Sequence, residues 1–379
     1  MERRSLDETN SDHKKMIQVA VVDDSAVVQE TFKQLLSQDP EINVLYTASD
    51  PIFALHKFEK QWPDVIITDI EMPRMDGISF IREIKKIRDT PIIVCSSVTG
   101  DLPRSTIAAL EAGAVEIIPK PQLAVKQFLQ DIEHKVVHLI KAAYAARKST
   151  TYGTRQVQAE SASDSPVTQK SAPTTGGDFD ALFDDPRSKL PCRLVAIGAS
   201  TGGVQALESI ITALRPPLPP IVIVQHMPEK FTEAFAQRLD HISVLHVREA
   251  RDSENLKNST VYIAPGNFHM EVRPDAAGFA CKISQTPPVN RHRPSVDVLF
   301  RSVARHVGKL SAGILLTGMG ADGAEGLLEM RKAGSRTCCQ DQASSIVFGM
   351  PYEGIRLGAA QTVISLDRMP QYIASLVHR

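Results

Sequence analysis

Short apolar runs rich in β-branched residues alternate with amphipathic segments along most of the chain. Four such runs lie in the first half, at 16–23 (MIQVAVVD), 65–69 (VIITD), 91–97 (PIIVCSS) and 115–120 (VEIIPK). Helical patterns separate them, for example at 25–38 and 77–88. Strands that alternate with helices predict a parallel sheet covered on both faces. We therefore expect one α/β domain over residues 16–140.

The same rhythm returns after Pro191. Apolar runs are found at 192–200, 219–227, 243–247, 260–267, 279–284 and 309–323. Helical segments are expected between them, at 202–214, 230–240 and 295–307. This pattern predicts a second doubly wound, parallel-sheet α/β domain over residues 191–379. The two halves share this architecture but no recognisable sequence motif.

The segment between the two domains has a different composition. Residues 148–191 are rich in Ser, Thr, Gln, Gly and Pro and contain few apolar side chains. Such a segment cannot bury a core, which favours a flexible linker. We place the linker at residues 141–190.

Composition excludes several classes of protein. The 43 basic and 44 acidic side chains give a net charge of −1, whereas a nucleic-acid binder usually has a basic excess. No apolar run approaches the roughly 20 residues that span a bilayer, and the polar N-terminus lacks the apolar region of a signal peptide. Five cysteines without C-x-x-C spacing indicate reduced, structural thiols. We expect a cytoplasmic protein with no nucleic-acid partner and no membrane insertion.

Polar residues gather at the ends of the strands predicted in the first domain. Asp23 and Asp24 follow the first run, Asp69 follows the second, and Ser96 and Lys120 end the last two. The carboxyl ends of parallel strands share one crevice. Clustered carboxylates suit Mg²⁺, and a lysine beside a hydroxyl suits a phosphate. Alternatively, the first two aspartates simply cap the helix that begins near residue 25.

The motifs VVDDS, DIEMPRMDG and PKP, with the serine that ends the 91–97 run, resemble a two-component receiver domain over residues 16–140. The resemblance implies that Asp69 accepts a phosphoryl group, which Ser96 and Lys120 contact. It also implies an Mg²⁺ site formed by Asp23, Asp24, Asp69 and the backbone carbonyl of Glu71. One departure is Ile117, where many receivers carry an aromatic switch residue.

In the second domain, GASTG at 198–202 fits the nucleophile-elbow pattern G-x-S-x-G. It also fits a phosphate-binding loop or a simple strand-to-helix turn. Three features argue against a phosphate-binding loop. The lysine of a Walker A motif is missing, the glycine spacing differs from that of dinucleotide-binding loops, and no acidic residue ends the next strand. A serine nucleophile needs a base and an orienting acid. His226 and Asp322 both follow apolar runs, whereas the rival acid Asp297 begins a predicted helix with no strand before it.

Chain order separates this domain from the α/β-hydrolases. The order here is Ser200, His226, Asp322, and the serine follows the first strand of its domain. The motifs GASTGG, VQHMP, APGNFHM, HRPSVD and LLTGMGADGAEG, over residues 193–375, resemble the catalytic domain of the chemotaxis protein-glutamate methylesterases, the CheB family. Together, the two resemblances indicate a response regulator with a methylesterase output domain, and imply a flavodoxin-like receiver joined to a Rossmann-like esterase domain.

The second resemblance also implies residue roles. Ser200 would be the nucleophile, His226 the general base and acid, and Asp322 the residue that orients it. The backbone N–H of Met319 would contribute to the oxyanion hole, with Thr201 supporting the site. We assign no catalytic role to the histidines at 269 and 292, for which packing or substrate contact is expected.

The resemblances imply a phosphorylation-activated hydrolase of glutamate γ-methyl esters on chemoreceptors, which releases methanol and also deamidates receptor glutamines in chemotactic adaptation. Its phosphodonor would be a histidine kinase of the CheA type, and methylated chemoreceptors its substrates. Mg²⁺ is expected at the receiver, and no cofactor at the esterase site. The unphosphorylated receiver would cover the crevice, less tightly if the linker is long. The alternative is a non-catalytic regulator whose output domain only sequesters a receptor or kinase.

Overall fold

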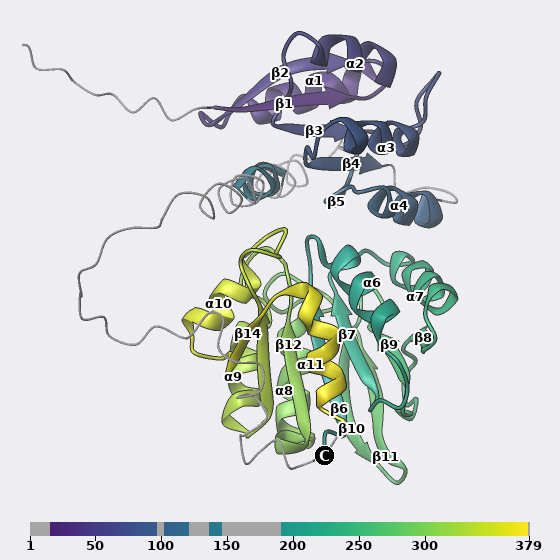
Figure 1. Cartoon of the computed structure of the whole chain (residues 1–379), viewed down its shortest axis with the longest axis vertical. Coiled ribbons are helices and arrows are strands. Elements are labelled where there is room, and N and C mark those ends of the chain that lie inside the picture. The colour runs from purple at the N-terminus through teal and green to yellow at the C-terminus, as the bar shows by residue number, and fades with distance from the viewer. Residues whose placement is uncertain (1–15, 97–101, 121–135, 146–190, 378–379) are drawn as a thin grey trace, which may run out of the picture.

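The chain forms two α/β domains, each with a parallel sheet between layers of helices (Figure 1). The computed structural model describes residues 16–96, 102–120, 136–145 and 191–377. Most of the predicted linker, residues 146–190, lies outside the described residues. The predicted fold class of two doubly wound parallel-sheet domains is confirmed.

The N-terminal domain has a five-stranded parallel sheet in the order β2-β1-β3-β4-β5. Its elements are β1 (Ile17–Val22), α1 (Ala26–Leu36), β2 (Ile42–Ala48), α2 (Pro51–Phe58), β3 (Val65–Thr68), α3 (Gly77–Ile87), β4 (Ile92–Ser96), α4 (Leu102–Glu111) and β5 (Glu116–Pro119). The pattern of apolar runs missed β2. That strand lies at the sheet edge, and its five central residues are only half-buried, so it has no continuous apolar run.

A further helical segment, at 136–145, packs on this domain. Its buried residues Val136, Leu139 and Ile140 join the apolar cluster formed by α1 and the sheet. The segment crosses the expected limit between domain and linker at residue 140, so that limit stays a prediction.

The C-terminal domain has a seven-stranded parallel sheet in the order β14-β13-β12-β6-β7-β9-β8. Its strands are β6 (Leu194–Ala199), β7 (Ile221–Gln225), β8 (His246–Glu249), β9 (Thr260–Ile263), β10 (His269–Asp275), β11 (Gly278–Ser284), β12 (Ser311–Leu315), β13 (Arg336–Gln340) and β14 (Thr362–Ile364). Its helices are α6 (Gly203–Ala213), α7 (Phe231–Ile242), α8 (Val296–His306), α9 (Ala324–Lys332), α10 (Met350–Arg356) and α11 (Met369–Ser375), with short 3₁₀ turns at Gly308–Leu310 and Leu366–Arg368.

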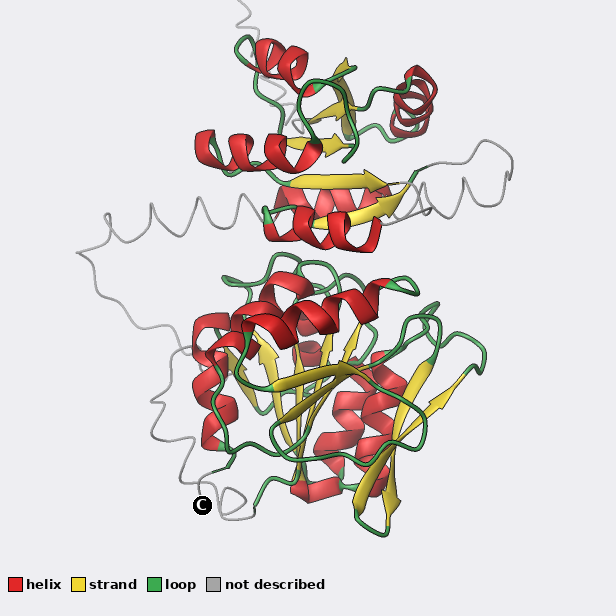
Figure 2. Cartoon of the chain, turned by 90° about the vertical axis from the view of Figure 1, so that its right-hand side faces the viewer, coloured by secondary structure: helices red, strands yellow, loops and turns green. Residues whose placement is uncertain are grey.

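The apolar run at 279–284 does not join the main sheet. It forms β11, which pairs with β10 in an antiparallel hairpin that packs against α8 (Figure 2). Only Ala280 and Cys281 are buried in this strand. A short apolar run cannot distinguish a strand of the main sheet from a hairpin that buries a few side chains against a helix.

Helices cover both faces of the seven-stranded sheet. On one face, α8, α9 and the start of α10 bury Leu299, Phe300, Leu327 and Met350. The other face is covered by α6, α7 and α11, whose buried residues include Leu207, Ile210, Phe235 and Ile373. With both faces buried, the functional surface of this sheet is left at the strand ends.

The two domains meet where α4 lies against α6 and α7 (Figure 1). Buried residues of α4 and α6, including Leu110 and Leu207, belong to one apolar cluster. Gln205 Nε2 donates to the carbonyls of Leu110 and Ala114, at the end of α4. Arg238 on α7 forms an ion pair with Glu111, with 2.5 Å between Nε and Oε1. The interface thus covers the edge of the sheet where β6 and β7 end.

The fully buried ring of Phe300 offers a test of domain independence. Phe300→Ala should destabilise the C-terminal domain by about 3–5 kcal/mol, because it removes a packed ring from the core. Unfolding followed by far-UV circular dichroism should shift to lower denaturant. The single tryptophan, Trp62, packs on Phe58 with 5.5 Å between ring centroids, so its fluorescence should report an unchanged N-terminal transition.

Arg305→Ala on the same helix is the matched control, because this exposed side chain should contribute less than about 0.5 kcal/mol. A fluorescence transition that moved together with the circular dichroism transition would mean that the two domains unfold as one unit.

Candidate active site and acidic pocket

Ser200 lies at the switch point of the C-terminal sheet. β6 is flanked by β12 on one side and by β7 on the other, and the connections after these strands diverge from this point. Ala199 pairs with Gln225 in the register of β6 and β7. Ser200 and His226 therefore leave adjacent strands at the same level, and crevices at such switch points are the usual ligand sites of parallel sheets.

Glycines give the turn around Ser200 its shape. Gly202 has a φ of 75°, in the left-handed region that glycine adopts without strain. A Cβ atom on Gly318 would lie 2.8 Å from the Cβ of Ser200, so only glycine fits there. The backbone N–H of Ser200 donates to the carbonyl of Thr317 at 3.0 Å. The turn is thus fixed by close backbone packing, with the serine at its apex and α6 beginning three residues later.

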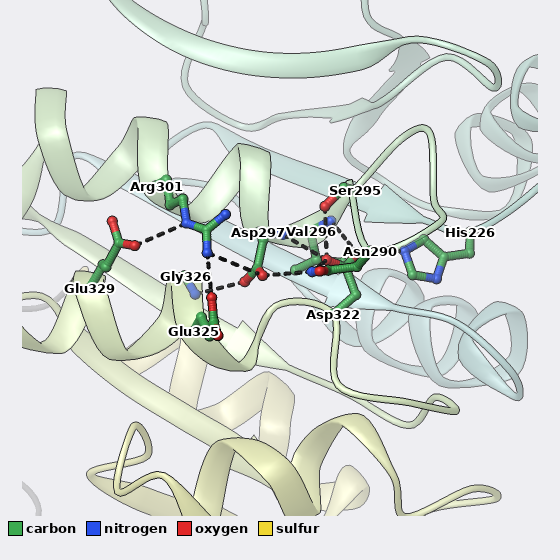
Figure 3. Close-up of polar contacts among 10 residues, drawn as sticks. All are labelled: His226, Asn290, Ser295, Val296, Asp297, Arg301, Asp322, Glu325, Gly326 and Glu329. Atoms are coloured by element: carbon green, nitrogen blue, oxygen red, sulfur yellow. Dashed lines mark hydrogen bonds and ion pairs between the residues drawn. The ribbon is translucent and has the colours of Figure 1, made fainter. Parts of the chain in front are cut away.

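His226 and Asp322 form a buried pair (Figure 3). The distance from His226 Nε2 to Asp322 Oδ2 is 2.9 Å, and the side chains are 8% and 1% exposed. Asp322 also accepts hydrogen bonds from Ser295 Oγ at 2.8 Å and from the backbone N–H of Val296 at 2.7 Å. Burial alone would raise the pKa of Asp322, but the contact with His226 and hydrogen bonds from the Asn290 and Ser295 side chains hold it well below its usual range.

This arrangement determines which nitrogen of His226 is free. An ionised carboxylate only accepts hydrogen bonds, so Nε2 carries the proton in the neutral ring. Nδ1 is buried and has no hydrogen-bond partner among the described residues. The ring is therefore reversed relative to a chymotrypsin-type triad, in which the aspartate binds Nδ1. In the described structure, Ser200 Oγ makes no hydrogen bond, and such contacts often form only when substrate binds.

The rival acid Asp297 does not contact His226. It lies in the first turn of α8, where it accepts from the backbone N–H of Gly326 at 2.7 Å and pairs with Arg301 at 3.5 Å (Figure 3). Burial raises the pKa of Asp297, although the Gly326 hydrogen bond acts in the opposite direction. Asp297 thus ties the start of α9 to α8.

Three residues beside this pair were not predicted as site residues. Asn290 Nδ2 donates to Asp297 Oδ2 at 2.7 Å and to Asp322 Oδ1 at 2.8 Å, and so links the two carboxylates (Figure 3). Ser295 donates to Asp322 from the residue before α8. The His292 ring stacks on His226, with 3.8 Å between ring centroids and 7° between planes. None of the three follows a strand of the main sheet, so they lack the strand-end position from which the other site residues were predicted.

His269 is fully buried in a packing role. Its Nδ1 accepts from the backbone N–H of Ser295 at 3.2 Å, and its Nε2 lies 3.1 Å from the carbonyl of Pro287. It holds the loop that leads into α8.

Met319 and Thr201 lie beside the serine turn. The carbonyl of Gly318 accepts from the backbone N–H groups of Gly349 and Met350. The next backbone N–H, that of Met319, donates to no acceptor in the described part of the chain. Thr201 is buried, and its carbonyl accepts from Thr317 Oγ1 at 2.9 Å. An unpaired N–H near a serine turn is the feature that an oxyanion hole requires.

The N-terminal domain brings its predicted strand-end residues together. Carboxylate oxygens of Asp23, Asp24 and Asp69 all lie within 4.8 Å of one another. Lys120 Nζ lies 2.7 Å from Asp69 Oδ2 and 3.1 Å from Asp23 Oδ2. Ser96 is buried at the end of β4. Hard carboxylate oxygens in a partly open cluster fit Mg²⁺, which keeps several water ligands.

Charge in this pocket is only partly balanced. Burial raises the pKa of Asp23, although hydrogen bonds from the Ser25 N–H and from Lys120 oppose the effect. The Lys120 pKa is raised because hydrogen bonds and charges from Asp69 and Asp23 outweigh its burial. Ser25, rather than either aspartate, caps α1 by accepting from the Val28 N–H. Glu71 is exposed and lines the same hollow as Asp24.

Comparisons with known proteins identify the family. The family profile for the CheB methylesterase domain matches residues 195–373, and that for the response regulator receiver domain matches residues 19–133. A protein from Leptospira interrogans, named protein-glutamate methylesterase/protein-glutamine glutaminase 3, is 48% identical over 93% of this chain and 98% of its own. The chain belongs to the CheB family.

A Pseudomonas syringae protein, named protein-glutamate methylesterase/protein-glutamine glutaminase 2, is also 48% identical, over 96% of this chain and 99% of its own. The solved catalytic domain of Thermotoga maritima CheB methylesterase is 36% identical and covers 50% of this chain and all of its own, with a TM-score of 0.48. The two family matches and the names of the 48% identical relatives confirm the predicted receiver and methylesterase domains, and so a hydrolase. Within its described residues, the chain has no helix long and apolar enough to cross a membrane.

The pKa shifts of Asp322 and Asp297 predict opposite effects of pH on stability. The lowered pKa of Asp322 means that its carboxylate stabilises the fold above the unfolded value of about 3.9 and loses this effect as the pH falls. The raised pKa of Asp297 means that its ionised form destabilises the fold. Protonation removes this destabilisation as the pH falls through the raised pKa.

The free energy of unfolding, measured in urea between pH 3 and 7, should show both effects. The difference between wild type and Asp322→Asn should shrink below about pH 4, because the unfolded-state pKa lies near that value. The difference between wild type and Asp297→Asn should instead grow in favour of wild type as the pH falls from 7 towards 4. Parallel pH profiles for the two variants would contradict the assignment.

Proposed function

We propose that this chain is a phosphorylation-activated protein-glutamate methylesterase that hydrolyses glutamate γ-methyl esters on chemoreceptors and releases methanol. By the same chemistry it deamidates receptor glutamines, and its pathway is chemotactic adaptation in the cytoplasm. The observation that carries the proposal is the buried pair of His226 and Asp322 beside Ser200 at the sheet switch point. The names of the 48% identical relatives support the substrate class.

The first half of the reaction is acyl transfer to Ser200. Its Oγ attacks the ester carbonyl while the lone pair of His226 Nδ1 takes the proton. The imidazolium that forms donates through Nε2 to Asp322, whose low pKa keeps it ionised. Methanol then leaves with the proton from Nδ1. For a glutamine the leaving group is ammonia, and the other steps are the same.

Charge on the tetrahedral intermediate needs stabilisation. The unpaired N–H of Met319 donates to the oxyanion, and the N-terminus of α6 directs its dipole towards the same crevice. Water then attacks the glutamyl ester on Ser200, with Nδ1 again acting as the base. No step requires a metal ion or organic cofactor at this site.

The receiver supplies regulation. Asp69 accepts the phosphoryl group from a histidine kinase of the CheA type, and Ser96 and Lys120 contact it. Asp23, Asp24, Asp69 and the carbonyl of Glu71 would hold Mg²⁺, which balances negative charge during phosphoryl transfer. Lys120 already contacts Asp69 at 2.7 Å, so a phosphoryl group there must change the contacts of Lys120.

The crevice beside Ser200 supports inhibition by the receiver. A cavity of about 30 Å³ lies between the domains, lined by Leu110 and Ile117 of the receiver together with Ser200 and His226. This space has room for only one or two water molecules and is too small for a glutamyl methyl ester. Ile117 lies on β5, and Lys120, which contacts Asp69, directly follows the last residue of that strand. Changes at Asp69 therefore have a short path to the interface.

Replacement of the nucleophile tests catalysis. Ser200→Ala should lower methanol release from methylated receptor membranes by about 10³-fold or more, because the covalent step is lost. Ser209→Ala, an exposed serine on α6, is the matched control and should match wild type. Equal release from wild type and Ser200→Ala would favour the non-catalytic alternative, in which the output domain only sequesters its partner.

Loss of the ion pair between Arg238 and Glu111 tests inhibition by the receiver. Arg238→Ala removes a partly buried pair worth about 1 kcal/mol, so basal methanol release without phosphodonor should rise about fivefold. The fully phosphorylated rate should stay the same, because Arg238 lies outside the catalytic contacts. Lys332→Ala, which removes an exposed charge at the far end of α9, should leave both rates unchanged. If Arg238→Ala left the basal rate unchanged, the result would contradict a role of this ion pair in holding the receiver over the crevice.

A further inference from the structure

Residues 289–292 form a two-residue hairpin turn beside the pair of His226 and Asp322. Val289 and His292 exchange both backbone hydrogen bonds, at 3.1 and 2.9 Å. The two central residues, Asn290 and Arg291, have φ values of 53° and 65°. Positive φ at both central positions defines a type I′ turn, in which asparagine followed by glycine is the preferred sequence.

Arginine at the second central position runs against local preference. An L-residue with a side chain in the left-handed region is strained relative to glycine, and such strain is concentrated at functional sites. Asn290 tolerates the conformation better, and its side chain is held by Asp297 and Asp322. Arg291 has no such compensation, since its exposed side chain makes no hydrogen bond or ion pair with any described residue.

The neighbouring arginine shows the contrast. Arg293 donates to Asn267 Oδ1 and to the carbonyls of Gln285 and Thr286, so its guanidinium supports the loop. The guanidinium of Arg291 is unused within the described fold. Arg291 therefore occupies a strained position without stabilising its own loop.

The position of Arg291 relates it directly to the reacting groups. The residue before it, Asn290, donates to Asp322, and the residue after it, His292, stacks on His226. Its backbone is thus fixed on both sides by residues that contact the catalytic pair. A charge carried by this turn therefore lies next to the catalytic pair, which the substrate segment must approach.

We propose that Arg291 is a substrate-binding residue that pairs with carboxylates flanking the scissile ester. This inference rests on the proposed function. The reaction itself leaves a glutamate wherever an ester is hydrolysed, so a segment with several modified sites presents carboxylates next to the remaining esters. A free guanidinium binds a carboxylate through paired, charge-assisted hydrogen bonds.

The strained backbone at residue 291 allows a test that separates loss of binding from loss of folding stability. Arg291→Gly relieves the backbone while it removes the charge, so the variant should unfold at the wild-type temperature or above it. With phosphodonor present, its KM for methylated receptor membranes should rise about tenfold, since a charge-assisted contact is lost, while kcat stays close to wild type. Arg291→Lys should recover part of the affinity. Lys332→Ala, the same loss of charge far from the crevice, should change neither constant.

Two further measurements separate binding from other roles. Hydrolysis of p-nitrophenyl acetate, which carries no flanking carboxylate, should be equal for wild type and Arg291→Gly. Added salt should weaken wild-type kcat/KM for receptor membranes more than that of the variant. A matching loss on the small ester would assign Arg291 to support of the catalytic pair and overturn the proposal, as would an unchanged KM.

Cosedimentation with methylated receptor membranes gives a readout independent of turnover. Wild type should bind more strongly than Arg291→Gly, and receptor-free membranes of the same lipids should bind both proteins equally weakly. A charge-dependent difference on receptor-free membranes would assign Arg291 to lipid headgroups and overturn the proposal. Wild type that binds receptors through Arg291 but releases no methanol would contradict the proposed function alone.

Discussion

The Asp322 carboxylate is the interaction on which the rest of the catalytic domain depends. It accepts hydrogen bonds from His226 after β7, from Asn290 in the turn at 289–292, and from Ser295 and Val296 at the start of α8. The loop that carries Asp322 is thus joined to two segments distant from it in the chain, the one after β7 and the one at 290–296. A buried charge is tolerated only when its hydrogen-bonding capacity is filled, so removal of this carboxylate would loosen all of these contacts together.

The two domains place buried carboxylates at the same kind of position but compensate them differently. In the receiver, Lys120 provides a fixed positive charge beside Asp69 and Asp23, and the exposed Asp24 leaves the pocket open to a cation. In the esterase domain, hydrogen-bond donors of His226, Asn290, Ser295 and the Val296 backbone surround the buried Asp322. The first arrangement can accept a new anionic group and respond to it, whereas the second holds an imidazole in one orientation. The way in which each domain stabilises its buried carboxylate therefore matches the role of that carboxylate.

Much of this organisation follows from the sequence because parallel strands bring their carboxyl ends to one edge. That rule located Ser200, His226 and Asp322 without knowledge of the three-dimensional contacts. It gave no signal for Asn290, whose importance depends on two aspartates 7 and 32 residues away. Nor did periodicity find the half-exposed edge strand β2, or separate the β10–β11 hairpin from the main sheet. Local patterns predict elements and their ends, but contacts made by irregular segments require the folded chain.

The small volume between Ser200 and the receiver has a consequence for signal flow. If the substrate binds there as proposed, substrate and the docked receiver cannot occupy that space together, so each disfavours the binding of the other. Thermodynamic linkage makes such exclusion reciprocal. If phosphorylation opens the crevice to a methylated receptor, then an engaged receptor must in turn favour the phosphorylated receiver by the same factor. The receptor would then act as an effector of its own demethylation, and the enzyme would retain its activating phosphoryl group longest where substrate is most abundant.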